Sequence, residues 1–314
     1  MRKWLPLSLK ILVSVGLFAY LITQTGSAAV FERIASIEIS TVMGFVFLLG
    51  LQILAAGARW LSVIRAIGCR VPYQTLVRIF YIGMFFNQAL PGGVGGDAMR
   101  TFLLTREGLR MGRAITSVLI ERATAVTGLI LLLVLAQPFI LQKIDESSKW
   151  VLVGVTGVVV AGLVGSLTCL MLLDRMPSWL FGSRLLKGLT LMAADMRTVF
   201  LSLGPLSRAL LWALSGHLIV TSYFYLVARG MHIPISMIDC LALVPIVLLV
   251  TLVPVSIGGW GVRETAMIIV FGWVGVPDES ALALSVTLGG LVLAASLPGG
   301  VVWLFARHRH TPPV

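Results

Sequence analysis

The residues in this chain best suited to bind an anion are two arginines that follow glycine-rich breaks in apolar sequence. The first break, Leu-Pro-Gly-Gly-Val-Gly-Gly-Asp-Ala-Met-Arg, runs from Leu90 to Arg100. The second, Val-Pro-Val-Ser-Ile-Gly-Gly-Trp-Gly-Val-Arg, runs from Val253 to Arg263 and aligns with the first without a gap at an offset of 163 residues. Guanidinium groups bind phosphate through paired, planar hydrogen bonds. The repeated pattern therefore predicts a site for an anionic group such as a phosphate.

Four positions are identical in the two segments, and each suits a break between helices. Proline ends the incoming helix, because it lacks an N–H and clashes with the preceding turn. Glycine allows positive φ angles and lets backbone N–H groups approach a ligand closely. Exposed N–H groups at the start of the next helix then favour an anion. The identical pairs are Pro91 and Pro254, Gly95 and Gly258, Gly96 and Gly259, and Arg100 and Arg263.

The two segments differ in charge. Asp97 in the first is replaced by Trp260 in the second, which instead gains Glu264 directly after its arginine. We expect Asp97 to cap a helix that restarts near Ala98, or to pair with Arg100 and hold the loop in shape. Glu264 should lie in the first turn of the following helix, where its charge is favourable. Two segments of similar architecture and different charge suit a site for an asymmetric molecule.

Three further charges lie within stretches long and apolar enough to span a membrane. They are Arg59, Glu121 and Arg122. A charge at the centre of a bilayer costs ~2.5–3.5 kcal/mol, so such residues usually face a cavity or a partner. We expect Arg59 to pair with Glu121 across helices, leaving Arg122 free for an anion, although Arg59 is also placed to extend to the cytoplasmic rim. Asn87, four residues before Pro91, is placed to bond freed carbonyls or a substrate.

The composition indicates an integral membrane protein. Hydrophobic residues make up 58% of the chain and charged residues 12%, and the mean hydropathy is +1.00. A helix of about 20 apolar residues matches the hydrocarbon thickness of a bilayer. Six stretches reach that length: Pro6–Gln24, Met43–Ile64, Ala114–Gln137, Trp150–Leu173, Arg208–Ala228 and Leu282–Phe305.

Shorter apolar stretches flank the two breaks. Ile79–Leu90 and Leu241–Val253 lead into them, and Ala266–Val276 follows the second. We interpret each break as a re-entrant hairpin buried in protein, because lipid cannot satisfy irregular backbone; the alternative is that Gly/Pro loops simply connect spans. Three full spans separate the breaks, so the hairpins would enter from opposite sides. The expected fold is one all-α membrane domain, residues 1–314, with six transmembrane helices and two re-entrant hairpins in an inverted repeat of roughly 1–140 and 150–306.

The basic residues set the expected orientation. With both termini in the cytoplasm, sixteen arginines and lysines face inward and five face outward, in agreement with the positive-inside rule. The net charge of +11 therefore has a topological cause, and with no nucleic-acid-binding motif we expect no nucleic-acid partner. The first apolar run is too long for a signal peptide, so we expect an uncleaved span. A Gly157, Ala161 and Gly165 stripe in the fourth span is interpreted as helix packing.

Recognised catalytic and metal-binding patterns are missing from the sequence. Cys69, Cys169 and Cys240 are odd in number and far apart, which suits neither a disulfide framework nor a metal site. His217 lies within a span and is expected to be a buried histidine with its hydrogen bonds satisfied. No hydrolase, metalloprotease or P-loop motif occurs. We therefore expect no cofactor, no metal and no intrinsic catalytic activity.

The combination of motifs resembles one family. Arg59-Trp60, the run Asn87 to Arg100, Glu121-Arg122 and the run Pro254 to Glu264 are similar to the flippase-like membrane region of bacterial lysylphosphatidylglycerol synthases, over nearly the whole chain. The resemblance implies a multi-pass protein of the bacterial inner membrane that handles phospholipids or polyprenyl-linked lipids. In larger relatives a soluble domain attaches lysine from charged tRNA. This chain ends at Val314, so we expect it to lack that activity.

Two classes of function compete at this point. The first is a lipid translocase whose arginines, Arg100, Arg263 and Arg122, bind a lipid phosphate near the midplane. The second is a membrane-embedded subunit or transferase that presents a lipid-linked intermediate to an enzyme. The expected partners are membrane lipids, with a second copy of the chain or a lipid-modifying enzyme as protein partner. A channel for cations is disfavoured by the scarcity of carboxylates.

Overall fold

The described part of the chain is a bundle of long apolar helices. The computed structural model describes residues 37–89, 95–175, 183–252 and 259–308, and every regular element within them is helical. Five of these helices are long and apolar enough to cross a bilayer. They are α3 (Ile39–Ala66), α6 (Met111–Ile140), α7 (Glu146–Met171), α9 (Leu203–Gly230) and α12 (Asp278–His308). The protein is thus a multi-pass membrane protein, and five of the six predicted spans are confirmed; Pro6–Gln24 lies outside the described residues.

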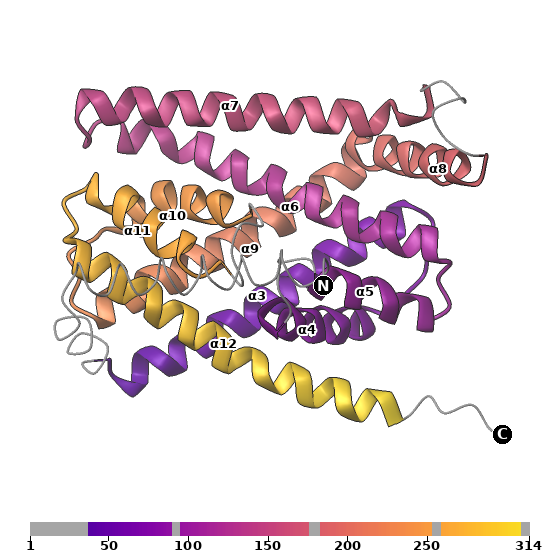
Figure 1. The fold of residues 1–314 in the computed structure, drawn as a ribbon, viewed down its shortest axis with the longest axis horizontal. Coiled ribbons are helices and arrows are strands. Elements are labelled where there is room, and N and C mark those ends of the chain that lie inside the picture. The colour runs from indigo at the N-terminus through magenta and orange to yellow at the C-terminus, as the bar shows by residue number, and fades with distance from the viewer. Residues whose placement is uncertain (1–36, 90–94, 176–182, 253–258, 309–314) are drawn as a thin grey trace, which may run out of the picture.

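Two pairs of shorter helices flank the repeated breaks. The first pair is α4 (Tyr73–Ala89) and α5 (Gly95–Arg106), and the second is α10 (Met237–Thr251) and α11 (Val262–Gly272). The members of each pair pack against each other. Along the long axis of the molecule, α4 and α5 lie toward the right of Figure 1 and α10 and α11 toward its left. Each break therefore joins two packed helices that are too short to span a bilayer alone.

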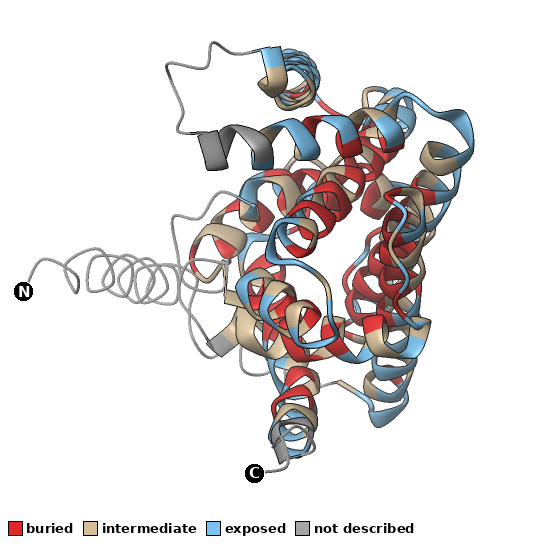
Figure 2. Cartoon of the chain, turned by 90° about the vertical axis from the view of Figure 1, so that its right-hand side faces the viewer, coloured by how far each residue is buried: buried red, intermediate tan, exposed pale blue. Residues whose placement is uncertain are grey.

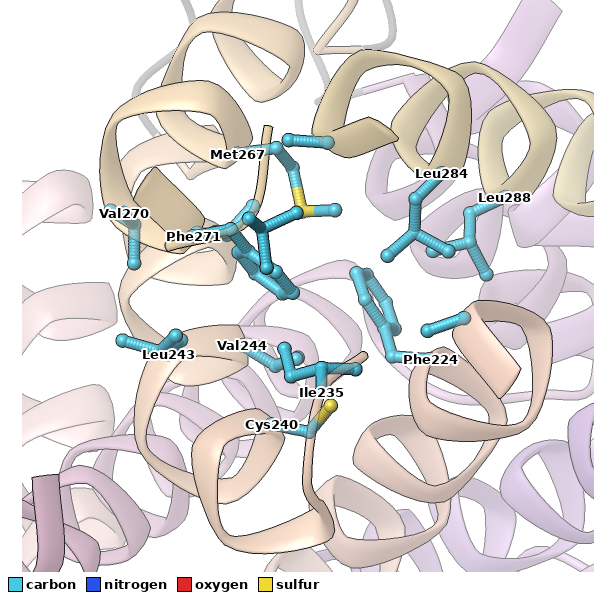
Figure 3. Packing of buried hydrophobic residues seen from close by; sticks show 14 of the residues in the cluster. Phe224, Ile235, Cys240, Leu243, Val244, Met267, Val270, Phe271, Leu284 and Leu288 are labelled. Carbon is cyan, nitrogen blue, oxygen red and sulfur yellow. The ribbon is translucent and has the colours of Figure 1, made fainter. Parts of the chain in front are cut away.

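The largest apolar core joins the second half of the chain to α3 and α6. In Figure 3 the side chains of Phe224, Met267 and Phe271 converge at the centre of this core, between α9 and α11. All three are nearly or fully buried. Because lipid tails are as apolar as these side chains, close packing rather than exclusion of water stabilises such a core in a membrane.

The helix α7 runs along the edge of the bundle (Figure 1). In Figure 2 it is seen end-on at the top, and most of its residues are exposed. A Cβ added at Gly157 or Gly165 would meet nothing within 4 Å. The prediction that these residues pack against another helix is therefore wrong for the described part of the chain. Asp145 caps α7 through the Ser148 N–H at 3.1 Å, and hydrogen bonds from Ser147 and Ser148 lower the pKa of the Asp145 carboxyl.

Between the predicted spans Trp150–Leu173 and Arg208–Ala228 the structure has an additional helix, α8 (Ser183–Phe200), which the sequence analysis did not predict. Asp195 on α8 accepts hydrogen bonds from the Nη1 of Arg113 on α6, at 2.9 and 3.0 Å. Arg197 donates to both oxygens of Asp174 in the short helix η1 (Leu173–Arg175), at 2.9 and 2.6 Å, and these hydrogen bonds lower the pKa of the Asp174 carboxyl. Ion pairs thus fasten α8 to the ends of α6 and α7.

Candidate functional site

Five charged side chains from three helices form a continuous chain of ion pairs inside the bundle. Glu121 of α6 is its most buried member, with an exposed fraction of 1%. Its Oε1 accepts a hydrogen bond from the Nε of Arg59 on α3 at 2.9 Å, and its Oε2 accepts one from the Nη2 of Arg100 on α5 at 2.8 Å. Arg100 continues the chain through Asp97, which also pairs with Arg122. The order of charges is therefore Arg59, Glu121, Arg100, Asp97, Arg122, with the sign alternating at each step.

Arg100 is the most enclosed of the three cations. Its guanidinium carbon lies 4.1 Å from the ring centroid of Trp60 and 5.0 Å from that of Phe80. A cation over an aromatic face gains ~2 kcal/mol or more when it is desolvated. The Nε of Arg100 is buried and has no hydrogen-bond partner among the described residues. The structure thus holds a buried cation with one donor still unsatisfied.

Asp97 occupies a different place from the one expected. The helix α5 begins at Gly95, so Asp97 lies inside the first turn and does not act as its N-cap. From there its carboxylate pairs with Arg100 at 3.3 Å and with Arg122. The expected pairing of Asp97 with Arg100 is confirmed, whereas the expectation that Arg122 is free is wrong. The earlier start of the helix explains both results, because it turns the Asp97 side chain toward α6.

Close contact between α4 and α5 fixes the position of this network. The Oδ1 of Asn87 accepts a hydrogen bond from the Gly96 N–H at 2.9 Å, so Asn87 holds the start of α5 rather than a freed carbonyl. A Cβ added at Gly96 would collide with the carbonyl oxygen of Gly83. A Cβ at Gly83 would lie 2.7 Å from the Cγ of Arg100. Glycine at both positions lets the two helices touch and lets Arg100 lie flat between them.

The ion-pair chain lines a cavity of about 330 Å³, within the range of roughly 300–1,000 Å³ that is usual for ligand sites. Its walls come from both halves of the sequence. The first half supplies the charged residues with Gln52 and Asn87, and the second half supplies Tyr223 of α9, Leu252 after α10 and Val292 of α12. Of the charged side chains in the described part of the chain that line it, three are guanidiniums and two are carboxylates. The cavity therefore carries one excess positive charge.

The second break carries its own polar cluster. Glu264 is fully buried and accepts a hydrogen bond from the Gly261 N–H at 2.6 Å. Arg263 donates to Glu264 at 2.6 Å and to the Oγ of Ser285 on α12 at 2.9 Å. The guanidinium of Arg263 also lies 4.8 Å from the Trp260 ring centroid. The predicted place of Glu264, in the first turn of α11, is confirmed. One cation and one carboxylate make this cluster neutral.

Glycine conformation explains the shape of the second break. Gly259 and Gly261 have φ angles of +79° and +85°, in the region that side chains rarely adopt. They flank Trp260 and turn the chain into α11. This backbone geometry positions Arg263 and Glu264 against α12 rather than toward the cavity of the first break.

The structure thus brings seven of the predicted site residues together and separates others. Arg59, Asn87, Gly96, Asp97, Arg100, Glu121 and Arg122 share one network or its immediate support, with Gly95 beginning α5. Gly259, Arg263 and Glu264 belong to the second cluster, and Arg263 is not among the residues that line the cavity. Pro91, Pro254 and Gly258 lie outside the described residues.

Some cavity residues were missed by the sequence analysis. Gln52 lies seven residues before Arg59 on α3, a spacing that returns to the same face of a helix. That signal was available in the sequence. Tyr223 carries no such signal, because only the packing of α9 against α3 and α6 brings it to the cavity. His217 behaves as expected, with its Nε2 2.9 Å from the Ala125 carbonyl oxygen.

Comparison with known protein families identifies the chain. The family model described as the lysylphosphatidylglycerol synthase TM region matches residues 7–299. The chain belongs to this family. The match spans both breaks and all five long helices, apart from the C-terminal turns of α12. No curated protein matches the chain. Membership of the lysylphosphatidylglycerol synthase TM region family gives a function related to membrane lipids.

Proposed function

We propose that the protein is a flippase-like translocase for phospholipids or polyprenyl-linked lipids, which binds the anionic headgroup in the cavity of the ion-pair chain. The observation that carries this proposal is the excess positive charge in that cavity. An uncompensated charge in the bilayer interior costs several kcal/mol. A bound lipid phosphate would neutralise the site, so charge balance favours an occupied cavity.

The lengths of the hydrogen bonds suggest how an anion enters the network. Arg100 holds Glu121 at 2.8 Å but Asp97 at 3.3 Å. Asp97 is therefore the weaker partner of Arg100. A phosphate that takes the place of Asp97 would bind Arg100 and Arg122 together, and it would satisfy the donor that Arg100 now leaves unpaired. Glu121 would keep Arg59 and Arg100 in position.

We further propose that the two short-helix pairs are re-entrant hairpins of inverted half-repeats, roughly residues 1–140 and 150–306. Three long helices, α6, α7 and α9, separate the pairs, and an odd number of crossings places them on opposite sides of the membrane. Their places toward opposite ends of the long axis in Figure 1 support this arrangement. The α4–α5 hairpin would enter from the cytoplasm, with both termini on that side of the bacterial inner membrane.

The second candidate is a membrane-embedded subunit or transferase that presents a lipid-linked intermediate to a partner enzyme. The ion-pair chain also suits this role, because holding a lipid phosphate requires the same cations. The two candidates differ in the product. A translocase changes the leaflet in which a lipid lies and leaves its chemistry unchanged, whereas a transferase makes a new lipid.

A transport assay in liposomes separates these functions. We expect the purified protein to move a fluorescent phosphatidylglycerol between leaflets, as followed by bleaching of the outer leaflet, with no new lipid detected by mass spectrometry. Arg100→Ala should abolish transfer, and Arg100→Lys should restore part of it, because an ammonium lacks the planar fork. Arg106→Ala is the matched control, because Arg106 lies on the same helix at its exposed end. Unchanged transfer by Arg100→Ala would refute the headgroup site.

Arg263 tests the second cluster in the same assay. We expect Arg263→Ala also to abolish transfer, because Glu264 would remain as a buried carboxylate without its cation. Membrane insertion should stay near normal. A new lipid product without transfer between leaflets would instead support the transferase.

A further inference from the structure

A second cavity opens beside the charged one, between two helices that α4 separates. Its volume is about 520 Å³, and its walls come from α3, α4 and α12. The helix α4 packs against both α3 and α12 and so forms the floor of a groove between them. We call it the α3–α12 groove. Its wall includes Val46, Gly50 and Leu54 of α3, Val77 of α4 and Val302 of α12.

The surface of the α3–α12 groove is almost entirely carbon. Two tyrosines line it, but the Tyr73 hydroxyl donates to the Leu54 carbonyl at 2.9 Å and the Tyr81 hydroxyl to the Ala295 carbonyl at 2.8 Å. Both hydroxyls are therefore used within the protein, and the rings present carbon to the groove. Apart from Gln74 and Arg78 of α4, the described side chains that line the groove leave no hydrogen-bonding group for a polar ligand. The groove matches a hydrocarbon chain.

The charged and amide side chains that line the groove both lie on the first half of α4. Arg78 pairs there with Glu107 at 2.8 Å, and both side chains are partly exposed. Gln74 lies one turn before Arg78 on the same helix and is exposed. The groove thus has an apolar body and a polar rim, which is the polarity of a lipid lying along a membrane protein.

The groove and the charged cavity share a wall. Leu49 of α3 lines both, while Gln52 and Arg59 of the same helix face only the charged cavity. A molecule whose anionic head lay in one space and whose apolar tail lay in the other would therefore contact Leu49 from both sides. Gly50, next to Leu49, adds room, because a Cβ built there would meet nothing within 4 Å.

We propose that the α3–α12 groove binds an acyl or prenyl chain of the lipid whose headgroup lies in the charged cavity. This inference rests on the proposed function and adds the path of the tail. The tail stays in an apolar environment beside α4 while the headgroup reaches Arg100. The lipid then enters the protein sideways, between α3 and α12, and not through the end of the bundle.

Photolabelling tests the path directly. A phosphatidylglycerol with a diazirine in one acyl chain is incorporated into nanodiscs with the full-length protein, and the labelled peptides are mapped by mass spectrometry. We expect strong labelling of groove peptides from α3, α4 and α12. Gly50→Trp, which fills the groove, should reduce that labelling about tenfold, equal to ~1.4 kcal/mol of binding free energy. Gly154→Trp is the matched control, because Gly154 is exposed on α7 with nothing within 4 Å.

Each outcome decides between explanations. Labelling of the groove no higher than that of the outer face of α7 would overturn the proposal, as would full labelling in Gly50→Trp and in the smaller variant Gly50→Leu. Cross-links from a photoreactive residue at position 50 to a peptide of this chain or of a second copy would show that protein fills the groove instead. If the wild-type protein transfers lipid while the groove stays unlabelled, the tail path is wrong and the translocase stands. A labelled groove without any transfer would support the tail site and refute the translocase.

Discussion

Glu121 holds the polar interior together, because its two oxygens accept hydrogen bonds from two different arginines. Arg59 approaches from α3 and Arg100 from α5. All three side chains are almost completely buried. Removing one member of such a network leaves buried charges without compensation, which usually costs more than the network contributes to stability when intact.

The first prediction concerns this carboxylate. Glu121→Gln keeps the shape of the side chain but leaves Arg59 and Arg100 facing a neutral group, so the free energy of unfolding should fall by ~3–5 kcal/mol. Titration with a denaturing detergent in mixed micelles measures this change. Glu107→Gln is the control, because the Arg78–Glu107 pair is partly exposed and should contribute only ~0–1 kcal/mol. Equal effects of the two substitutions would contradict the central role of Glu121.

Much of this network was predictable from the sequence, and one part was not. Arg59 and Glu121 are charged residues within apolar helices, and an unpaired charge inside a membrane has a high free-energy cost. Their pairing was therefore predictable from that cost. The partner of Arg122 depended on the residue at which α5 begins. Capping rules favoured Asp97 as the cap, but the helix starts at Gly95. The helix thus starts three residues before the predicted start near Ala98, and three residues correspond to about 300° of turn around a helix, which changed the partner of Arg122.

At the scale of elements, α12 approaches α11 closely enough for one glycine to matter. A Cβ at Gly289 would collide with the Nη2 of Arg263 and lie 2.8 Å from the Trp260 ring. The next residue, Gly290, faces open space. A side chain at position 289 would therefore have to displace Arg263 or Trp260 of the second polar cluster.

The second prediction uses these neighbouring glycines as a matched pair. Gly289→Ala should lower the free energy of unfolding by ~1–3 kcal/mol through overpacking, and it should displace Arg263 from Glu264 and Ser285. Gly290→Ala should instead raise the free energy of unfolding by ~0.5–1 kcal/mol, because alanine favours a helix. The same micelle titration measures both. Shifts of the same sign would mean that Arg263 moves aside without cost.

The sequence predicts the described membrane-spanning helices correctly, because their length and hydropathy alone identify them. The five described spans were found because each exceeds the thickness of a bilayer in apolar residues. The helix α8 was missed because it is too polar to span a membrane, although its apolar residues recur on one face as in an amphipathic helix. Its position depends on Asp195 meeting Arg113. Such pairing between distant segments leaves no local pattern.

At the scale of the whole molecule, the proposed inverted arrangement predicts the side of the membrane on which both ends of each hairpin lie. Arg70 and Arg110 lie just outside the α4–α5 pair, and Pro234 and Asp278 lie just outside the α10–α11 pair. All four residues are exposed. If the pairs are re-entrant and inverted, the first two positions share one side of the membrane and the last two share the other.

The third prediction tests that arrangement with single cysteines at these four positions, after the three native cysteines are replaced by serine. A membrane-impermeant thiol reagent should label positions 234 and 278 in intact cells and positions 70 and 110 only after the membrane is opened. The two positions around one hairpin serve as controls for each other. Labelling of positions 70 and 110 from different sides would show that α4 and α5 together cross the membrane, and the inverted-repeat proposal would then be wrong.

The pairing of Arg59 with Glu121 also sets an order for synthesis. The two residues are 62 positions apart, so at ~5–20 residues per second the ribosome needs roughly 3–12 s to make the second after the first. During that interval α3 carries a charge that lipid disfavours. We therefore expect the insertion machinery to retain α3 until α6 emerges, and cross-linking of stalled nascent chains measures this retention. On this expectation, the ion pair of the finished interior also sets the time at which the first described helix enters the bilayer.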